Sequence, residues 1–288
     1  MKILVTGGAG FVGSNLADRL LKDGHSVNIL DSMTTGRKEN INARAKFFKG
    51  DIRDEDDIMS AISGCGAVFH LAAQTDARAA DEDSSYKINY LGAKNVFDAA
   101  KDSNAKIIFT SSAAVYGERQ AACKESDKCE PVGDYGKNKL RAEKAAGGNA
   151  FIARMFNVYG PRGGGAVNIF CGRIPEYKEI RVFGNGLQTR DFVHVDDAVN
   201  ALLIGLEKSG VYNVGTGVET SILNLIDMIF AMTRNKPNAR HEQEKKEIKR
   251  SKADITKIKA LGWEPKVAIK DGIKSLLKSK GARLANDI

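Results

Sequence analysis

The sequence predicts an α/β fold with a doubly wound parallel sheet and a smaller C-terminal lobe. Short apolar segments alternate with amphipathic ones in the first half of the chain, as in successive βαβ units. The apolar segments contain few polar residues, which is typical of strands that helices cover on both faces. The expected strands, in chain order, are KILVTG, SVNILD, AKFFKGD, GAVFHLAA and AKIIFTSS.

The segments between these strands have helical periodicity. An amphipathic stretch ends at Lys22, and residues 84–103 and 134–146 place apolar side chains at helical spacing among good helix formers. Gly147 and Gly148 follow the last of these segments and predict its end.

The character of the chain changes beyond Arg154, with a glycine-rich stretch and short strand-like pieces. We expect residues 1–154 to form one domain and residues 155–288 a smaller lobe. The segment at about 186–213, which includes RDFVHV and a helical run, is expected to return a strand and a helix to the first sheet. The two parts are therefore predicted to be interleaved.

Composition and cysteine use narrow the class of protein. The 288 residues are 42% hydrophobic, enough for a sizeable core. No segment approaches the roughly 18 uninterrupted apolar residues of a membrane helix, and the first residues lack the features of a signal peptide. We expect a cytoplasmic protein without a membrane partner. The spacing of the four cysteines does not fit a metal site, so we expect reduced thiols and no metal; the cysteines are Cys65, Cys123, Cys129 and Cys171. Cys123 and Cys129 share a predicted loop, so a disulfide between them is the alternative.

The positive charge of the chain lies near its C-terminus. Residues 236–288 hold 15 Lys+Arg against 7 Asp+Glu, and the remainder is balanced at 29 against 29. These lysines alternate with acidic and apolar residues and lack an aromatic platform, which indicates a solvated helical face and not a nucleic-acid partner. Such a face would also attract an anionic substrate.

A glycine-rich turn follows the first predicted strand. VTGGAGFVG satisfies both GxGxxG and GxxGxxG, the pattern of a Rossmann-type fold that binds a dinucleotide. Glycine permits positive φ and close approach of the backbone to a pyrophosphate, and the following helix start offers free N–H groups. The predicted cofactor contacts in this turn are Gly7, Gly10, Phe11, Val12 and Gly13.

Side chains at other strand ends extend this cofactor site. Asp31 ends the second strand, where a carboxylate accepts hydrogen bonds from ribose hydroxyls and repels a 2′-phosphate, so NAD is favoured over NADP. Arg37 and Lys38 keep the NADP alternative open. Further contacts are predicted from Asp51 and Ile52 at the adenine and from Leu71, Ala72 and Ala73 along the dinucleotide.

Tyr135 and Lys139 stand four residues apart in YGKNK, on one face of a predicted helix. A phenol has a pKa near ~10, and a fixed cation beside it lowers that value. The strand AKIIFTSS brings serine hydroxyls to the carboxyl edge of the sheet, where open α/β folds bind ligands. These three features together predict a base, its cation and a hydroxyl donor.

Taken in order, several segments resemble the extended short-chain dehydrogenase/reductase superfamily, nearest its UDP-glucose 4-epimerase branch. They are TGGAGFVG, GDI, HLAA, FTSSAAVYG, YGKNK, RMFNVYGPR, RDFVHVDD and YNVGTG, and they span nearly the whole chain. The resemblance implies Tyr135 as the base, Lys139 on the nicotinamide ribose, Ser112 on the sugar hydroxyl and Asn89 in the surrounding network. It also implies NAD that accepts hydride from sugar C4 and returns it.

The residues after Ser112 bear on the reaction. Related dehydratases and decarboxylases carry an acidic residue there, whereas this chain has Ala113 and Ala114, which cannot transfer a proton. The cysteine of fucose-type epimerase-reductases is also absent. The resemblance therefore favours simple 4-epimerisation of UDP-glucose and UDP-galactose.

The resemblance also implies a site for the nucleotide sugar. The expected contacts are Ser111, Ser112, Asn157, Phe183, Arg190, Glu247 and Arg250. Glu244 stands where the family usually has a phosphate-binding arginine, so either Lys245 or Arg250 compensates, or nucleotide binding is weaker or different. A homodimer is expected, although the helix that commonly forms its interface is short here.

Several alternatives remain open. Ser251 is small enough to admit an N-acetyl group, and Thr110, Ser111 and Ser112 also resemble the hydroxyl row of UDP-glucuronate epimerases, so UDP-N-acetylhexosamine and UDP-glucuronate are alternative substrates. An NAD-dependent nucleotide-sugar dehydrogenase or reductase is a second activity. A non-catalytic dinucleotide-sensing or nucleic-acid-binding module is a third possibility, which the intact Tyr135 and Lys139 disfavour.

Overall fold

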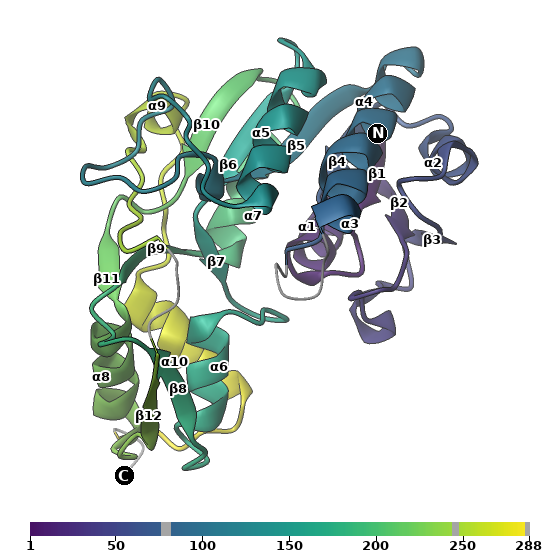
Figure 1. Cartoon of the computed structure of the whole chain (residues 1–288). Coiled ribbons are helices and arrows are strands. Elements are labelled where there is room, and N and C mark those ends of the chain that lie inside the picture. The colour runs from purple at the N-terminus through teal and green to yellow at the C-terminus, as the bar shows by residue number, and fades with distance from the viewer. Residues whose placement is uncertain (76–81, 244–247, 286–288) are drawn as a thin grey trace. The chain divides into compact units, whose positions relative to one another are not determined.

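The computed structural model describes residues 1–75, 82–243 and 248–285, and Figure 1 shows the course of the chain. Two compact units are present. Unit one comprises Met1–Gly117, Glu125–Met155 and Val199–Tyr212, and unit two comprises Glu118–Lys124, Phe156–Ala198 and Asn213–Ile288. The chain therefore passes between the units several times.

Unit one is built on a seven-stranded sheet of order β10-β6-β5-β4-β1-β2-β3. The pairs from β6 through β3 are parallel, and the order reverses between β1 and β4, as in a Rossmann-type doubly wound sheet. This confirms the predicted fold class. The strands are β1 (Lys2–Thr6), β2 (Ser26–Asp31), β3 (Lys46–Lys49), β4 (Ala67–His70), β5 (Lys106–Ser112), β6 (Phe151–Met155) and β10 (Gly210–Val214).

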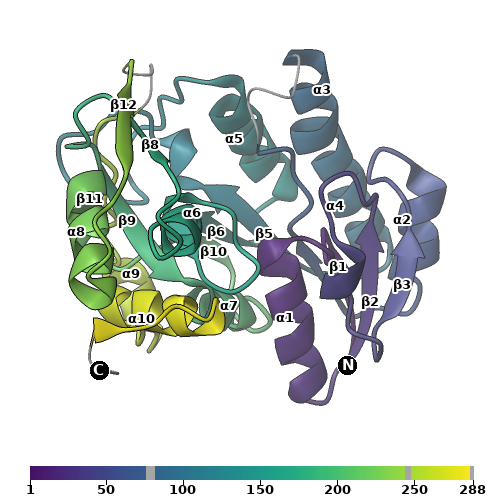
Figure 2. The ribbon, with the colours of Figure 1, turned by 90° about the horizontal axis from the view of Figure 1, so that it is seen from below.

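Helices cover this sheet on both faces, as Figure 2 shows. Apolar residues of α2, α4 and α5 form one core with the strands, while α1 lies on the opposite face, where Arg19 donates to Asn200 of α7. The helices are α1 (Phe11–Lys22), η1 (Lys38–Asn40), α2 (Glu55–Ile62), α3 (Glu82–Tyr86), η2 (Lys87–Gly92), α4 (Ala93–Asp102), η3 (Ala113–Val115), α5 (Asp134–Ala146) and α7 (Val195–Ile204), the last shared between the units.

The predicted helices agree closely with the observed ones. Helix α5 spans the predicted residues 134–146 and stops at Gly147, which has φ of +82° and therefore a backbone conformation that glycine adopts without strain. The segment predicted as one helix at 84–103 contains α3, the π-helical turn η2 and α4 in succession. Asn89 lies in this π-helical turn.

Unit two contains two small sheets and four helices within the described residues. One sheet has the order β11-β9-β7, and the other pairs β12 with β8. Apolar residues of α6, α8 and α10 form a separate core with those of β7, β8 and β9. The elements are β7 (Asn157–Tyr159), α6 (Ala166–Arg173), β8 (Ile180–Phe183), β9 (Thr189–His194), β11 (Glu219–Ser221), α8 (Ile222–Thr233), β12 (Ala239–Glu242), α9 (Thr256–Lys259) and α10 (Ile269–Ser279).

One strand lies in a different sheet from the one expected. RDFVHV forms β9, which pairs with β7 and β11 in unit two and not with the seven-stranded sheet. The edge of the large sheet next to β6 is occupied by β10 instead. Alternating apolar residues identify a strand, but they do not specify its partner, so the pattern could not distinguish the two sheets.

All four cysteines are free thiols, and Cys65, Cys123 and Cys171 are buried. Among the described residues, no helix is both long and apolar enough to cross a membrane.

Candidate active site

The glycine turn between β1 and α1 is packed too closely for side chains. Gly7 has φ of +69°, and a Cβ there would lie 2.7 Å from the backbone nitrogen of Ala72. A Cβ on Gly13 would lie 2.2 Å from the carbonyl oxygen of Gly7. Both obstacles are backbone atoms, which cannot rotate away, so the turn requires glycine at these positions.

The first turn of α1 presents backbone N–H groups without intrahelical partners. The first helical hydrogen bond runs from Ser14 N–H to Gly10 O, so the N–H groups of Phe11, Val12 and Gly13 precede it, and no side chain caps this end. A glycine cradle that ends in free N–H groups fits the pyrophosphate of a dinucleotide.

Asp31 is buried beside this turn, at the end of β2. Its carboxylate accepts hydrogen bonds from Ala9 N–H at 3.0 Å and from Met33 N–H at 2.8 Å. These bonds fix the carboxylate at the carboxyl edge of the sheet. That is where a dinucleotide-binding fold places its ribose-binding acid.

The segment after β4 lies against the glycine turn. Leu71 N–H donates to the Thr6 carbonyl, and Ala72 N–H donates to Thr6 Oγ1 at 3.3 Å. Ala73 follows in the same extended segment. The structure thus brings this predicted part of the cofactor path to the predicted phosphate cradle.

Asn89 is fully buried and bonds the backbone of the loop that follows β4. Its Oδ1 accepts from Gln74 N–H at 2.9 Å, and its Nδ2 donates to the Gln74 carbonyl at 2.9 Å and to Ser85 Oγ at 3.2 Å. Asn89 therefore positions the loop beside the predicted site.

Asp51 and Ile52 follow β3. The Asp51 carboxylate accepts hydrogen bonds from Arg53 at 3.0 and 2.6 Å, and this arginine lowers the pKa of the carboxyl below its ordinary value. Ile52 is buried and packs with α2 and α4.

Tyr135, Lys139 and Ser112 converge at the carboxyl end of β5. The Ser112 hydroxyl lies close enough to the Tyr135 phenol to lower the pKa of the phenol. Lys139 Nζ donates to the Thr110 carbonyl at 2.9 Å and lies 5.9 Å from the centroid of the Tyr135 ring. Tyr135 retains some exposure, whereas Lys139 is only 2% exposed. The phenol is therefore partly exposed, and the lysine beside it is buried.

Burial sets the protonation of this pair. It raises the pKa of Tyr135 to about 12, against the opposing effect of the Ser112 hydrogen bond. It also lowers the pKa of Lys139 to about 7, against the opposing charge of Glu143. A further positive charge near the phenol would be needed to make Tyr135 an effective base at neutral pH.

His70 ends β4 on the other side of Lys139. Its Nδ1 lies 2.7 Å from Thr6 Oγ1, its ring stacks on Phe109, and burial together with the Lys139 charge lowers its pKa well below the ordinary value. The imidazole is therefore neutral, and Lys139 is the group beside it that can carry a positive charge.

A buried ion pair lies behind Lys139 and was not predicted. Glu143 accepts hydrogen bonds from Ser111 Oγ at 2.5 Å and from Arg154 at 3.0 and 2.7 Å. Arg154 also contacts the face of the Tyr116 ring. Two signals in the sequence point to the pair: a carboxylate four residues after Lys139, and an arginine within an otherwise apolar strand.

The predicted contacts to the nucleotide lie in unit two. Arg190 Nη1 donates to the Thr189 carbonyl at 2.8 Å, and Arg250 makes a bidentate ion pair with Glu219 at 2.8 and 2.7 Å. Asn157 is exposed on β7, and the Phe183 carbonyl accepts a hydrogen bond from Gln188 at 2.9 Å. Glu244, Lys245 and Glu247 fall outside the described residues.

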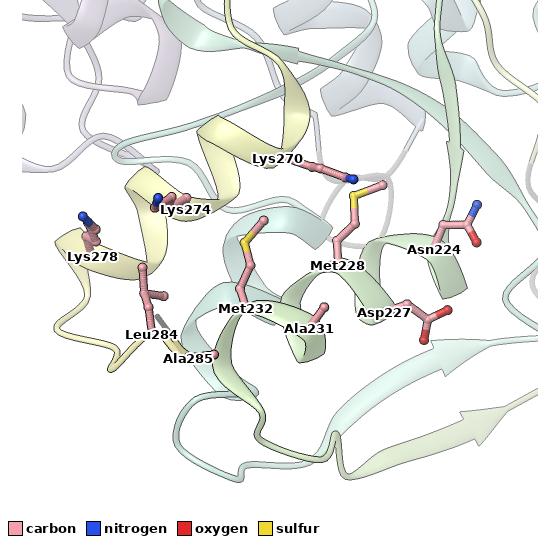
Figure 3. Close-up of a pocket in the computed structure, with 10 residues that line it drawn as sticks. All are labelled: Asn224, Asp227, Met228, Ala231, Met232, Lys270, Lys274, Lys278, Leu284 and Ala285. Carbon is pink, nitrogen blue, oxygen red and sulfur yellow. The ribbon is translucent and has the colours of Figure 1, made fainter. Parts of the chain in front are cut away.

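A separate pocket of about 590 Å³ lies between α8 and α10 of unit two (Figure 3). Met228 and Met232 line one side, and Lys270, Lys274 and Lys278 line the other. Its lining contains none of the predicted site residues. The candidate active site is therefore the group of converging side chains in unit one, and this pocket is separate from it.

Comparison with known proteins identifies the family. The model of the NAD dependent epimerase/dehydratase family matches residues 3–215. This chain belongs to that family. The resemblance to extended short-chain dehydrogenases and the prediction of an NAD-dependent enzyme are thereby confirmed, and the cofactor is NAD.

Relatives extend the match over nearly the whole chain. A UDP-glucose 4-epimerase of Mycolicibacterium smegmatis is 34% identical over 95% of this chain and 96% of its own. UDP-glucuronic acid decarboxylase 1 of Arabidopsis thaliana is 31% identical over 100% of this chain and 71% of its own.

Solved structures show the same fold. The Thermotoga maritima UDP-glucose 4-epimerase with UDP-glucose has a TM-score of 0.92 at 33% identity, over 96% of this chain and 98% of that one. The Bacillus cereus UDP-glucuronic acid 4-epimerase with UDP-glucuronic acid and NAD has a TM-score of 0.90 at 30% identity, over 98% and 99%. The chain is therefore similar to proteins that act on different UDP-sugars.

Proposed function

We propose that this enzyme interconverts UDP-glucose and UDP-galactose by epimerisation at C4. The observation that carries the proposal is the convergence of Tyr135, Ser112 and Lys139 at the end of β5, in a chain that has alanine at positions 113 and 114. This set supplies a base, a hydroxyl donor and a cation. It contains no acidic side chain after Ser112 to assist elimination or decarboxylation.

The residues that would hold NAD are the glycine cradle of Gly7 to Gly13, the Asp31 carboxylate and Lys139. Bound NAD would supply reversible hydride acceptance and a positive nicotinamide ring. Tyr135 would take the proton of the sugar 4-hydroxyl and return it, with Ser112 donating a hydrogen bond to the sugar oxygen. Lys139 would stabilise the phenolate through its ammonium group.

Two hydroxyls near the site support a neutral hexose over a sugar carboxylate. Ser111 Oγ donates to Glu143, and Thr110 Oγ1 donates to the His70 carbonyl at 3.0 Å. A hydroxyl has one proton to donate, so neither offers a donor to a sugar carboxylate in this arrangement. UDP-glucuronate, the ligand of the Bacillus cereus enzyme, is therefore the second candidate substrate and UDP-glucose the first.

We place the nucleotide end of the substrate at Asn157, Phe183, Arg190, Glu247 and Arg250, following the family resemblance. Arg190 and Arg250 are the guanidinium groups of this set, and the planar fork of a guanidinium suits bidentate binding of phosphate oxygens. A homodimer is part of the same proposal.

The experiment is product analysis by NMR after incubation with NAD and UDP-glucose, UDP-N-acetylglucosamine or UDP-glucuronate separately. We expect UDP-galactose from UDP-glucose, without net accumulation of NADH. Tyr135→Phe should reduce turnover by a factor of about 10²–10⁴, because it removes the acid–base group. Tyr177→Phe removes a phenol that bonds Asn235 on the surface of unit two and should leave turnover unchanged.

Stoichiometric NADH formation would favour the dehydrogenase alternative instead. Full turnover by Tyr135→Phe would contradict the proposed mechanism.

A further inference from the structure

We propose that Glu143 is a positioning residue, which joins helix α5 to strands β5 and β6 and holds Lys139 in the ammonium form that Tyr135 requires. This inference rests on the proposed function, in which Lys139 stabilises the phenolate of Tyr135. It adds a group that touches neither substrate nor cofactor in that proposal and acts through Lys139.

The spacing of three side chains on α5 is the first observation. Tyr135, Lys139 and Glu143 follow one another at intervals of four residues and therefore lie along one face of the helix. Glu143 is 8% exposed and Lys139 is 2% exposed. The carboxylate is thus the next group beyond the ammonium on a face that packs against β5.

The second observation is how the carboxylate is held. Ser111 of β5 and Arg154 of β6 are register partners in the parallel sheet, and both donate hydrogen bonds to Glu143. The ion pair is buried, with both side chains 6% exposed. Separating the two side chains would leave an uncompensated buried charge, which strongly destabilises the folded state. The pair therefore holds the Glu143 carboxylate in place.

The third observation connects this bond to the catalytic groups. Thr110 and Ser111 are consecutive in β5: the Thr110 carbonyl accepts a hydrogen bond from Lys139, and the Ser111 hydroxyl donates one to Glu143. Two neighbouring residues of one strand therefore hold two side chains that stand four residues apart on α5.

Glu143 also acts on Lys139 through its negative charge. Tyr135 and Glu143 lie on the face of α5 that carries the ammonium, and the neutral His70 lies near it at the end of β4. The buried positive charge nearby is Arg154 of β6, which pairs with Glu143. The charged residues of neighbouring elements pair among themselves near the surface, as in Lys94–Asp98, Lys101–Asp98 and Lys87–Asp83. Among the described residues, Glu143 is the negative charge that raises the pKa of Lys139 against burial.

The decisive experiment is an NMR titration of the cofactor-free protein labelled with ¹³C at lysine Cε. Lys139 should titrate near pH 7 and stand apart from lysines that titrate near pH ~10.4, and Lys139→Met assigns its signal. In Glu143→Gln, which preserves the shape of the side chain, we expect the midpoint to fall by roughly one pH unit or more. Asp98→Asn on α4 removes an exposed carboxylate and should leave the midpoint in place.

A second variant guards against misfolding. Glu143→Met combined with Arg154→Met removes the whole buried ion pair and leaves no unpaired charge. Its midpoint should also fall, but by less than in Glu143→Gln, because the guanidinium charge that opposes Glu143 is removed with it. An unchanged midpoint in both variants would overturn the inference and reduce Glu143 to a purely structural group.

The pH dependence of kcat provides the functional measurement. Loss of the ammonium as pH rises sets the upper limb of the profile, so Glu143→Gln should move that limb to lower pH, with about a tenfold loss above it for each unit of movement. Glu143→Asp should restore the limb in part. Absence of epimerisation by the wild type would overturn the proposed function, while the titration would still decide on Glu143.

Discussion

Replacing Lys139 with methionine should stabilise the cofactor-free protein while abolishing its activity. Burial lowers the pKa of Lys139 from its ordinary 10.5 to about 7, so holding the ammonium in the folded state is unfavourable. Each pH unit between these values corresponds to about 1.36 kcal/mol, which gives a penalty of roughly 4 kcal/mol at pH 7. In the variant the Thr110 carbonyl loses its hydrogen-bond donor, and this loss offsets about 1 kcal/mol of the expected gain in stability.

The net expectation is a gain of roughly 3 kcal/mol in the free energy of unfolding at pH 7. The sign follows from linkage. Because the folded pKa lies below the unfolded one, the penalty is complete below pH 7 and disappears as the pH approaches 10.5. The gain should therefore vanish near pH ~9.5, where the remaining penalty no longer exceeds the lost hydrogen bond.

Urea denaturation of the cofactor-free wild type and Lys139→Met, at pH 7 and at about pH 9.5, measures both quantities. Lys137→Met on the same helix is the matched control, since this lysine is exposed and should change stability by less than about 0.5 kcal/mol. Destabilisation by Lys139→Met at pH 7, or a gain of equal size at both pH values, would refute the reasoning.

Two further substitutions test the packing of each unit. Gly13→Ala should abolish NAD binding and lower stability by about 1–3 kcal/mol, because its Cβ would lie 2.2 Å from the Gly7 carbonyl oxygen. Isothermal titration with NAD measures the first effect and urea denaturation the second. Wild-type affinity for NAD would show that the glycine cradle is not needed. Gly272→Ala should destabilise the protein by about 1–3 kcal/mol, because its Cβ would lie 2.1 Å from the buried Tyr159 hydroxyl. Adding Tyr159→Phe removes that hydroxyl and should recover part of the lost stability. No recovery in the double variant would contradict the steric explanation.

Local chemistry made much of unit one predictable from the sequence. The glycine turn is dictated by backbone sterics, and the structure places Gly7 and Gly13 where a Cβ cannot fit. Helix α5 begins and ends at the predicted residues, because a pair of glycines follows a segment rich in helix formers. Tyr135 and Lys139 could be joined to Ser112 because parallel strands bring their carboxyl ends to one edge.

Features that depend on pairing between distant segments were less accessible. The sheet to which β9 belongs is decided by competition with β10 for the edge next to β6, and apolar alternation is the same in either case. Glu143 and Arg154 are eleven residues apart in the sequence. The position of each is unusual for a charged residue, but their pairing depends on the register of β5 and β6, which brings Ser111 and Arg154 side by side. Once buried, Glu143 pairs with Arg154, and its charge affects the pKa of the neighbouring Lys139.

The central claim is that Tyr135 and its neighbours support reversible oxidation at C4 of a UDP-hexose. UDP-glucose that carries deuterium at C4 tests it most directly, with UDP-galactose isolated and analysed by mass spectrometry and NMR. We predict UDP-galactose that retains the deuterium at C4, because the hydride returns to the carbon from which it left. Formation of UDP-galactose without the label, or loss of the label to NADH without epimerisation, would contradict the account.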